Sequence, residues 1–314
     1  MNRFTRAVLA LQLIATGACA AEQAPAASLV RTLNTLTEDS ARQIAEAARS
    51  KAAQLESGVV KGAKCKMHVW VLGRDGTPLS ITQANGAWQG SADIARRKAR
   101  TAWMFKLPTR KIGELSRAEQ AAKGPLYMIE VSNGGLISFP GGLPIFDATG
   151  GLIGTIGVSG DTVDNDEAVA QAGVDAAKAL KGGTAPLKTL TQTGAAEVLA
   201  AAVAAGARTK SGVYDAPTKM HVYVMGAEGT VLAASQADDA WPGSADIAYK
   251  KARAVWCFHF PTEVVGSFSR PEQAAKGPLY GIELSNDGLI TFPGGLPIND
   301  ADGSFVGAIG VSGD

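Results

Sequence analysis

The fold is decided by two stretches of sequence, KMHVWVLGRDGTPLS (66–80) and FPGGLPIFDATGGLIGTIGVSGD (139–161). Each returns later in the chain, as KMHVYVMGAEGTVLA (219–233) and FPGGLPINDADGSFVGAIGVSGD (292–314), and the residues between them align without a gap. A repeat of this length far exceeds the roughly 20–50 residues of solenoid repeats. The sequence therefore predicts one domain copied whole, with matching positions adopting matching structures.

Each copy alternates helix-like and strand-like segments. An Ala-rich helix pattern opens it, and strand patterns separated by Gly and Pro turns follow, with another helix between them. In the first copy the expected strands are 68–71, 78–82, 126–131, 136–139 and 152–158. This order predicts an α+β fold of two tandem modules, each an antiparallel sheet of about five strands packed with helices.

Helix-start signals set the expected domain boundaries. Thr37 and Ser91 stand where side-chain caps are favoured, and Asp93 suits the first turn of the helix that follows. A closing helix is expected over 164–181 in the first copy only, because the second copy stops at Asp314. The expected organisation is a first module at 28–181, a linker at 182–188, and a second module at 189–314 that lacks the closing helix.

The N-terminus reads as a targeting segment. Arg3 and Arg6 precede a short apolar stretch, and Ala18-Cys19-Ala20 forms an A-x-A-like cleavage site. The stretch is shorter than the roughly 20 residues that span a bilayer. We expect residues 1–20 to be a signal peptide and the protein to be periplasmic or secreted; a lipoprotein cleaved before Cys19 is the alternative.

Charge and cysteine content exclude several classes of function. The formal net charge is +1 and no block of like charge stands out, so nucleic-acid binding is not expected. After the signal peptide two cysteines remain, Cys65 and Cys257, and they do not occupy matching positions of the repeat. A disulfide framework is therefore not expected, and no zinc-type ligand spacing is present.

Two histidines, His68 and His221, do occupy matching positions, each at the start of a predicted strand. Strand alternation places His68 on the same face as Trp70. A histidine beside an aromatic ring suits axial ligation of a haem iron. The alternative is a half-buried strand histidine that bonds to a neighbour. His259 has lysine, Lys106, at its matching position, and we interpret it as a polar residue at a helix C-terminus.

Several cationic residues are also shared between the copies. Lys98 and Lys251 match, as do Arg100 and Arg253. Such side chains neutralise a bound carboxylate or propionate, although surface ion pairs explain them equally well. The shared charged positions contain no complete catalytic set, so a catalytic residue is not assigned.

The paired motifs resemble the GlcG/HbpS-like family. They are GSADIA-x-x-KAR at 90–100 and 243–253, and FPGGLPI followed by G-x-IGVSG at 139–160 and 292–313. The resemblance covers nearly all of both modules and implies haem binding, haem degradation in some members, and assembly into homo-oligomers. Many members carry Asp where this chain has Gly73 and Gly226, and the family offers no invariant haem ligand, so the assignment of His68 and His221 is our own inference.

The sequence thus leads to one main hypothesis and one alternative. The main hypothesis is an exported protein that binds haem or a related tetrapyrrole, with His68 and His221 as iron ligands and Lys98, Lys251, Arg100 and Arg253 as propionate partners. The alternative is a non-catalytic accessory module for a periplasmic oxidoreductase, because a fused pair imitates two subunits of a homo-oligomer. Either way, we expect a pseudo-dimer or a homo-oligomer.

Overall fold

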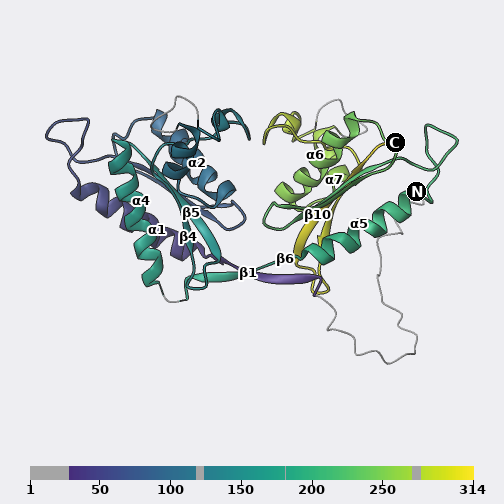
Figure 1. Ribbon diagram of the computed structural model, residues 1–314, viewed down its shortest axis with the longest axis horizontal. Coiled ribbons are helices and arrows are strands. Elements are labelled where there is room, and N and C mark those ends of the chain that lie inside the picture. Colours follow the sequence, from purple (N-terminus) through teal and green to yellow (C-terminus); the bar gives the residue numbers. More distant parts are fainter. Residues whose placement is uncertain (1–27, 118–123, 181, 271–276) are drawn as a thin grey trace.

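The chain forms two modules that face each other and are joined at one end by a two-stranded ribbon (Figure 1). The structure is a computed structural model that describes residues 28–117, 124–180, 182–270 and 277–314. The predicted signal peptide, residues 1–20, lies outside the described residues. None of the described helices is both long and apolar enough to cross a bilayer.

The first module is built on a four-stranded antiparallel sheet with strand order β3-β2-β5-β4. The strands are β2 (His68–Gly73), β3 (Pro78–Gln83), β4 (Gly142–Phe146) and β5 (Leu152–Ser159). Every residue of β5 is buried, which its apolar and glycine-rich sequence allows. Gly157 is needed there because a Cβ would overlap the carbonyl oxygen of Ala95 in the helix above it.

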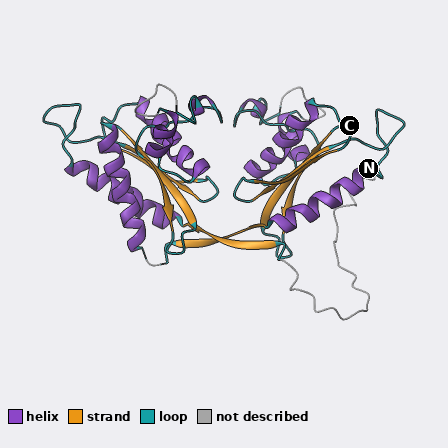
Figure 2. Cartoon of the chain, in the orientation of Figure 1, coloured by secondary structure: helices purple, strands orange, loops and turns teal. Residues whose placement is uncertain are grey.

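Helices cover both faces of this sheet (Figure 2). The face toward the other module carries α2 (Gly90–Phe105) and the short α3 (Thr109–Ser116). The opposite face carries α1 (Glu38–Gln54) and α4 (Val163–Ala179), which lie side by side. Ile44 of α1, Val169 of α4 and Ile156 of β5 belong to one buried apolar cluster, so both helices contribute to the core.

The second module repeats this plan with one helix fewer among its described residues. Its sheet has strand order β8-β7-β10-β9. The strands are β7 (His221–Gly226), β8 (Val231–Gln236), β9 (Gly295–Asn299) and β10 (Phe305–Ser312); the helices are α5 (Gln192–Gly206), α6 (Gly243–Phe258) and α7 (Thr262–Ser269). In the described part of the chain, α5 has no neighbour in the place that α4 takes beside α1. Among the described residues the two modules therefore differ by this helix.

A ribbon that the sequence did not predict joins the modules. Strand β1 (Val30–Leu36) pairs antiparallel with β6 (Thr184–Leu190), and Leu33 lies opposite Leu187 at its centre. Residues 182–188 were expected to be a linker, yet β6 begins inside them. The loop-like signals there are compatible with a strand, because Gly182 and Gly183 precede it and a proline such as Pro186 is tolerated where a strand lies at a sheet edge.

Two of the predicted strands are not formed. Residues 126–131 end in a 3-10 turn at Ile129–Val131, and residues 136–139 run outside the sheet ladder. Strand β4, which was not predicted, joins the three predicted strands that do form, so each sheet has four strands instead of about five. The carboxylate of Glu130 explains the local fold, because it accepts hydrogen bonds from the hydroxyls of Ser116 and Ser138 and holds these segments together. The α+β tandem architecture itself is confirmed.

Candidate functional site

The two predicted iron ligands lie buried in separate modules. His68 is 3% exposed and His221 is 4% exposed, each at the start of a central strand. The Nε2 atom of His221 lies 3.1 Å from the carbonyl oxygen of Trp241. The Nε2 atom of His68 has no hydrogen-bond partner within the described residues. A planar cofactor would reach either ring only if the covering residues moved, and ligation at these positions stays a prediction.

A small cavity lies next to the segment that leads into β2, and His68 is not among its lining residues. Lys66, Trp88 and Gly160 line it, and its volume is about 110 Å³. Sites for small molecules and cofactors usually have volumes of about 300–1,000 Å³. A cavity of this size does not hold a tetrapyrrole, and ligation by His68 stays a prediction.

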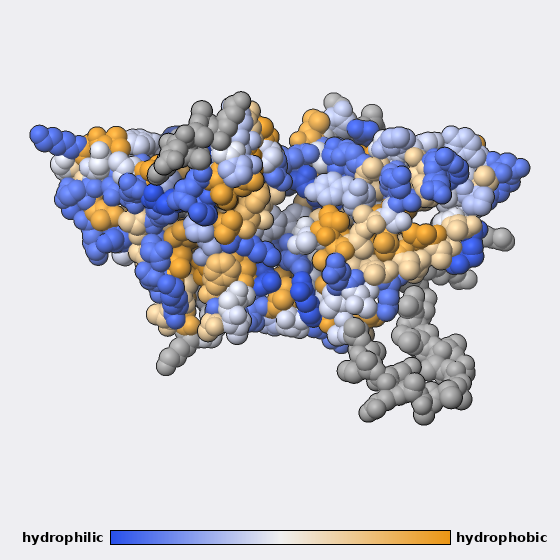
Figure 3. Space-filling view, in the orientation of Figure 1, coloured by the Kyte–Doolittle hydropathy of each residue, from blue (hydrophilic) through white to orange (hydrophobic). Residues whose placement is uncertain are grey.

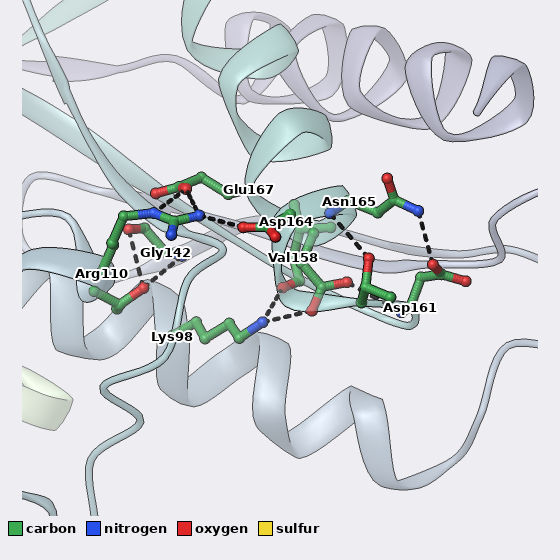
Figure 4. A network of polar contacts seen from close by, with 11 residues as sticks. Lys98, Arg110, Gly142, Val158, Asp161, Asp164, Asn165 and Glu167 are labelled. Atoms are coloured by element: carbon green, nitrogen blue, oxygen red, sulfur yellow. Dashed lines mark hydrogen bonds and ion pairs between the residues drawn. The ribbon is translucent and has the colours of Figure 1, made fainter. Parts of the chain in front are cut away.

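The matched lysines have different partners in the two modules. The ammonium of Lys98 donates to the carboxylate of Asp166 in α4 at 2.6 Å and to the carbonyl of Val158 at 2.9 Å, and it is completely buried (Figure 4). The ammonium of Lys251 donates to the carbonyl of Val311 at 2.9 Å but forms no ion pair with a described residue. Desolvation alone lowers the pKa of Lys251 to about 8.

The matched arginines meet where the modules face each other. Arg100 lies 3.7 Å and Arg253 lies 3.4 Å from the same carboxylate, that of Asp287. Arg100 also donates to the carbonyl of Asn133 at 2.6 Å. Of the six predicted site residues, the structure thus brings together only these two, and both belong to the boundary between the modules.

Two cavities at this boundary occupy matching positions. A cavity of about 180 Å³ is lined by Arg74, Trp103, Met104, Lys106, Leu152 and residues 228–230. The second cavity has a volume of about 460 Å³ and is lined by the repeat equivalents of these residues, with the roles of the two modules interchanged. Cys257, His259 and Phe305 take the places that Met104, Lys106 and Leu152 take in the first cavity. Trp103 and Trp256 stack between the modules with ring centroids 6.4 Å apart. The duplicated fold has therefore produced two related cavities with different chemistry.

The larger cavity is lined by His259, the one histidine among the described residues that is not buried. His259 follows the last residue of α6 in a left-handed conformation, with a φ of 57°, and stacks on Phe305 with centroids 3.9 Å apart. No hydrogen bond joins its ring nitrogens to another described residue. The sequence analysis set His259 aside because the other copy has Lys106. Because the two copies differ at this position, comparing their sequences did not indicate a site. The position became a candidate only when the structure showed that the modules face each other.

The volume and lining of the larger cavity fit a planar aromatic ligand. Its size falls within the usual range for cofactor sites. Trp256, Phe258 and Phe305 supply apolar walls, and the imidazole of His259 supplies a donor of the type that holds haem iron. Asp75 is the only carboxylate in the lining, and Arg100 and Arg253 reach Asp287, next to the lining residue Asn286.

Comparison with known proteins identifies relatives that each match a little under half of the chain. A protein of 15.0 kDa encoded between dhaT and dhaS of Citrobacter freundii is 31% identical over 142 residues, covering 45% of this chain and 91% of that protein. The crystal structure of ORFY from Klebsiella pneumoniae is 30% identical, covers 48% of this chain and 94% of its own, and has a TM-score of 0.41. A structure described as a PduOC–haem complex is 26% identical, covers 45% and 94%, and has a TM-score of 0.38.

A family model covers most of the chain in two parts. It is described as haem degrading protein HbpS-like, and it matches residues 36–175 and 190–314. The two matches coincide with the two modules of the fold, each with its sheet and its inward-facing helix. The chain therefore belongs to the HbpS-like family and carries the family's domain twice.

Proposed function

We propose that this protein binds haem or a related tetrapyrrole in the larger cavity between its modules, with His259 as the iron ligand. The observation that carries the proposal is an imidazole without a hydrogen bond to a described residue, in a cavity of about 460 Å³, in a chain of the HbpS-like family. Bound haem would supply an iron centre whose visible spectrum reports its axial ligand. Arg100 and Arg253 are the propionate partners in this proposal, because they are the predicted cations at the module boundary.

Titration with hemin tests both the function and the ligand. We expect a saturable shift of the Soret band with one equivalent of hemin, and we expect His259→Ala to abolish the shift or weaken binding at least about tenfold. The double variant His68→Ala, His221→Ala is the matched comparison, because it removes the other two imidazoles while leaving the cavity intact.

The outcomes separate three readings. An absent Soret shift in the unmodified protein contradicts haem binding altogether. A shift that persists in His259→Ala and disappears in the double variant moves the ligand to the strand histidines. A shift that survives both changes excludes all three imidazoles as ligands.

We also propose that the protein is exported, on the basis of the N-terminal sequence alone. The arginines, the short apolar stretch and Ala18-Cys19-Ala20 support cleavage after Ala20. N-terminal sequencing of the protein recovered from the periplasm or the medium tests this. A first residue of Ala21 agrees with cleavage after Ala20, a lipid-modified Cys19 supports the lipoprotein alternative, and an intact Met1 contradicts export.

A further inference from the structure

We propose that the outer face of the second module, formed by α5, β9 and β10, binds an amphipathic helix of a partner polypeptide that carries an acidic residue in its first turn. In the first module the matching face is covered by α4 (Figure 1). The inference concerns a different surface from the haem cavity and does not depend on haem binding.

The internal repeat shows what this face is built to contact. Residues that are buried in the first module are more exposed at the matching positions of the second. Leu143 is 6% exposed and its match Leu296 is 38% exposed; Ile156 is fully buried and its match Ile309 is not. Phe292 is 51% exposed, whereas its match Phe139 is half-buried. Apolar residues also gather over α5 in the space-filling view (Figure 3).

Lys251 gives the face a specific charge requirement. Its match Lys98 is neutralised by Asp166, which lies in the first turn of α4 and is 1% exposed. Lys251 is itself 4% exposed and lies 4.6 Å from the centre of the Phe292 ring, with no carboxylate paired to it in the described part of the chain. A partly desolvated ammonium of this kind is stabilised by an opposite charge brought by the helix.

The loop that leads to α4 has the same geometry in the two modules. The carboxylate of Asp161 accepts from the backbone N–H of Gly58 at 2.8 Å, and that of Asp314 accepts from the N–H of Gly212 at 2.9 Å. The backbone that leads to this face therefore follows the same path in both modules. The place beside Lys251 where the first turn of a helix equivalent to α4 would lie is preserved.

One matched position on α5 indicates what the partner places opposite it. Thr37 and Thr191 cap α1 and α5 at equivalent positions, so Val198 of α5 matches the buried Ile44 of α1, and Val198 is only partly buried. Gly173 of α4 packs against Ile44, and it comes seven residues after Asp166, on the same side of the helix. The partner helix is therefore expected to carry an acid and, two turns later, a small residue that faces Val198.

Binding of a peptide tests the proposal with the full chain. The probe is a labelled peptide with the α4 sequence TVDNDEAVAQAGVDAAKA (162–179), followed by fluorescence anisotropy. Because an isolated helix of this length is marginal in water, the titration should extend to millimolar concentration. We expect saturable binding of one peptide per chain, weakened at least about tenfold by Asp166→Asn in the peptide. Asp175→Asn is the control, because Asp175 is 58% exposed in α4.

Variants of the protein locate the contact. With Lys251→Met, the original peptide and its Asp166→Asn version are expected to bind equally well. Lys250→Met is expected to preserve the difference between the two peptides, because Lys250 pairs with Asp246 on its own helix. Val198→Ile is expected to tighten binding by restoring the residue found in α1.

Two results overturn the proposal. One is a lack of saturable binding, or binding that is indifferent to both Asp166→Asn in the peptide and Lys251→Met in the protein. The other is a dimer in solution whose interface excludes the peptide, because the face would then be occupied by a second copy of the chain.

Discussion

Lys98 and Lys251 occupy matching positions of the repeat, but only one of them has an ion-pair partner in the described structure. Both ammonium groups donate to a carbonyl of the central strand and lie over a phenylalanine ring. Only Lys98 has a carboxylate beside it in the described structure. Removing one member of a buried ion pair leaves the other charge uncompensated, whereas removing an unpaired buried charge relieves a desolvation cost.

Replacement by methionine should therefore act in opposite directions at the two positions. Lys98→Met is expected to lower the free energy of unfolding by about 3–5 kcal/mol, because Asp166 stays buried without a partner. Lys251→Met is expected to raise it. Urea unfolding at pH 7, followed by circular dichroism, measures both. Equal destabilisation by the two variants would contradict the difference in their surroundings.

The same lysine predicts a pH dependence of stability. The pKa of Lys251 is about 8 in the folded protein, against 10.5 for an ordinary lysine. Between these pH values the unfolded chain binds more protons than the folded one, so the contribution of Lys251 to stability rises with pH. Below pH 8 both states are protonated and the destabilisation is complete.

Comparing the unmodified protein with the Lys251→Met variant isolates the contribution of Lys251 to the pH dependence of stability. Burial raises the pKa of Cys65 from 9.0 to about 11, which makes stability fall with pH from about 9 upward. This effect occurs in both proteins, so the difference between the unmodified protein and Lys251→Met is the quantity to measure. We expect the difference to shrink as the pH rises from 8 to 10. A constant difference would show that Lys251 titrates normally.

At the scale of the elements, the first residues of α1, α5 and α2 show where the local sequence determines how a helix is capped. The hydroxyl of Thr37 accepts from the N–H of Ser40 at 3.2 Å, and that of Thr191 accepts from the N–H of Gly194 at 3.1 Å. Ser91 was predicted to cap α2, but that helix begins one residue earlier, at Gly90, and Gln89 precedes it without a side-chain cap. Asp93 instead pairs with Arg96 and Arg97 in the first turn of α2.

Alanine substitutions should distinguish Thr37, which caps a helix, from Ser91, which does not. Thr37→Ala is expected to lower the free energy of unfolding by about 1 kcal/mol, because it removes a capping hydrogen bond. Ser91→Ala is expected to lower it by less, because no cap is lost. The measurement is urea unfolding of each variant, and a larger loss at Ser91 than at Thr37 would contradict the assignment of the caps.

The parts of the fold that the sequence predicted are those with local signals. The central strands, the closing helix and the tandem α+β plan follow from apolar periodicity and from the repeat itself. The ribbon of β1 and β6 was missed because its partners, such as Leu33 and Leu187, are far apart in the chain. The segment around Glu130 was mistaken for a strand because its hydrogen bonds come from side chains outside that segment.

The candidate site was harder to predict, because it belongs to the boundary between modules. His68 and His221 matched as a pair, and pairing suggested function, but both are buried at the starts of strands, in separate modules. Arg100 and Arg253 were recognised, and their meeting at Asp287 was not. His259 lines a cavity that exists only when both modules are present, so no pattern within one copy could indicate it.

In the molecule as a whole, the two modules are arranged like the two subunits of a dimer, within one chain. The ribbon pairs seven residues of β1 with β6, and Arg31 of β1 reaches Glu228 of the second module at 3.1 Å. Trp103 and Trp256 add a second contact far from the ribbon in sequence. The modules are therefore held together by noncovalent contacts as well as by the peptide chain.

Cutting the chain between Gly182 and Gly183 tests this. A protease site inserted there is expected to yield two fragments that still elute as one particle at micromolar concentration, because the ribbon and the tryptophan contact remain. Size-exclusion chromatography with light scattering gives the mass before and after cleavage. Fragments that separate at once would show that the covalent connection alone keeps the modules together.

The two related cavities have a consequence for how such a protein changes over time. In a dimer of identical subunits every substitution appears twice, so both cavities change together. Here the codons for His259 and Lys106 are separate, so each cavity can change its residues while the other keeps its own. Gene fusion has thus released the two pockets from enforced symmetry, and one of them is free to specialise without loss of what the other does.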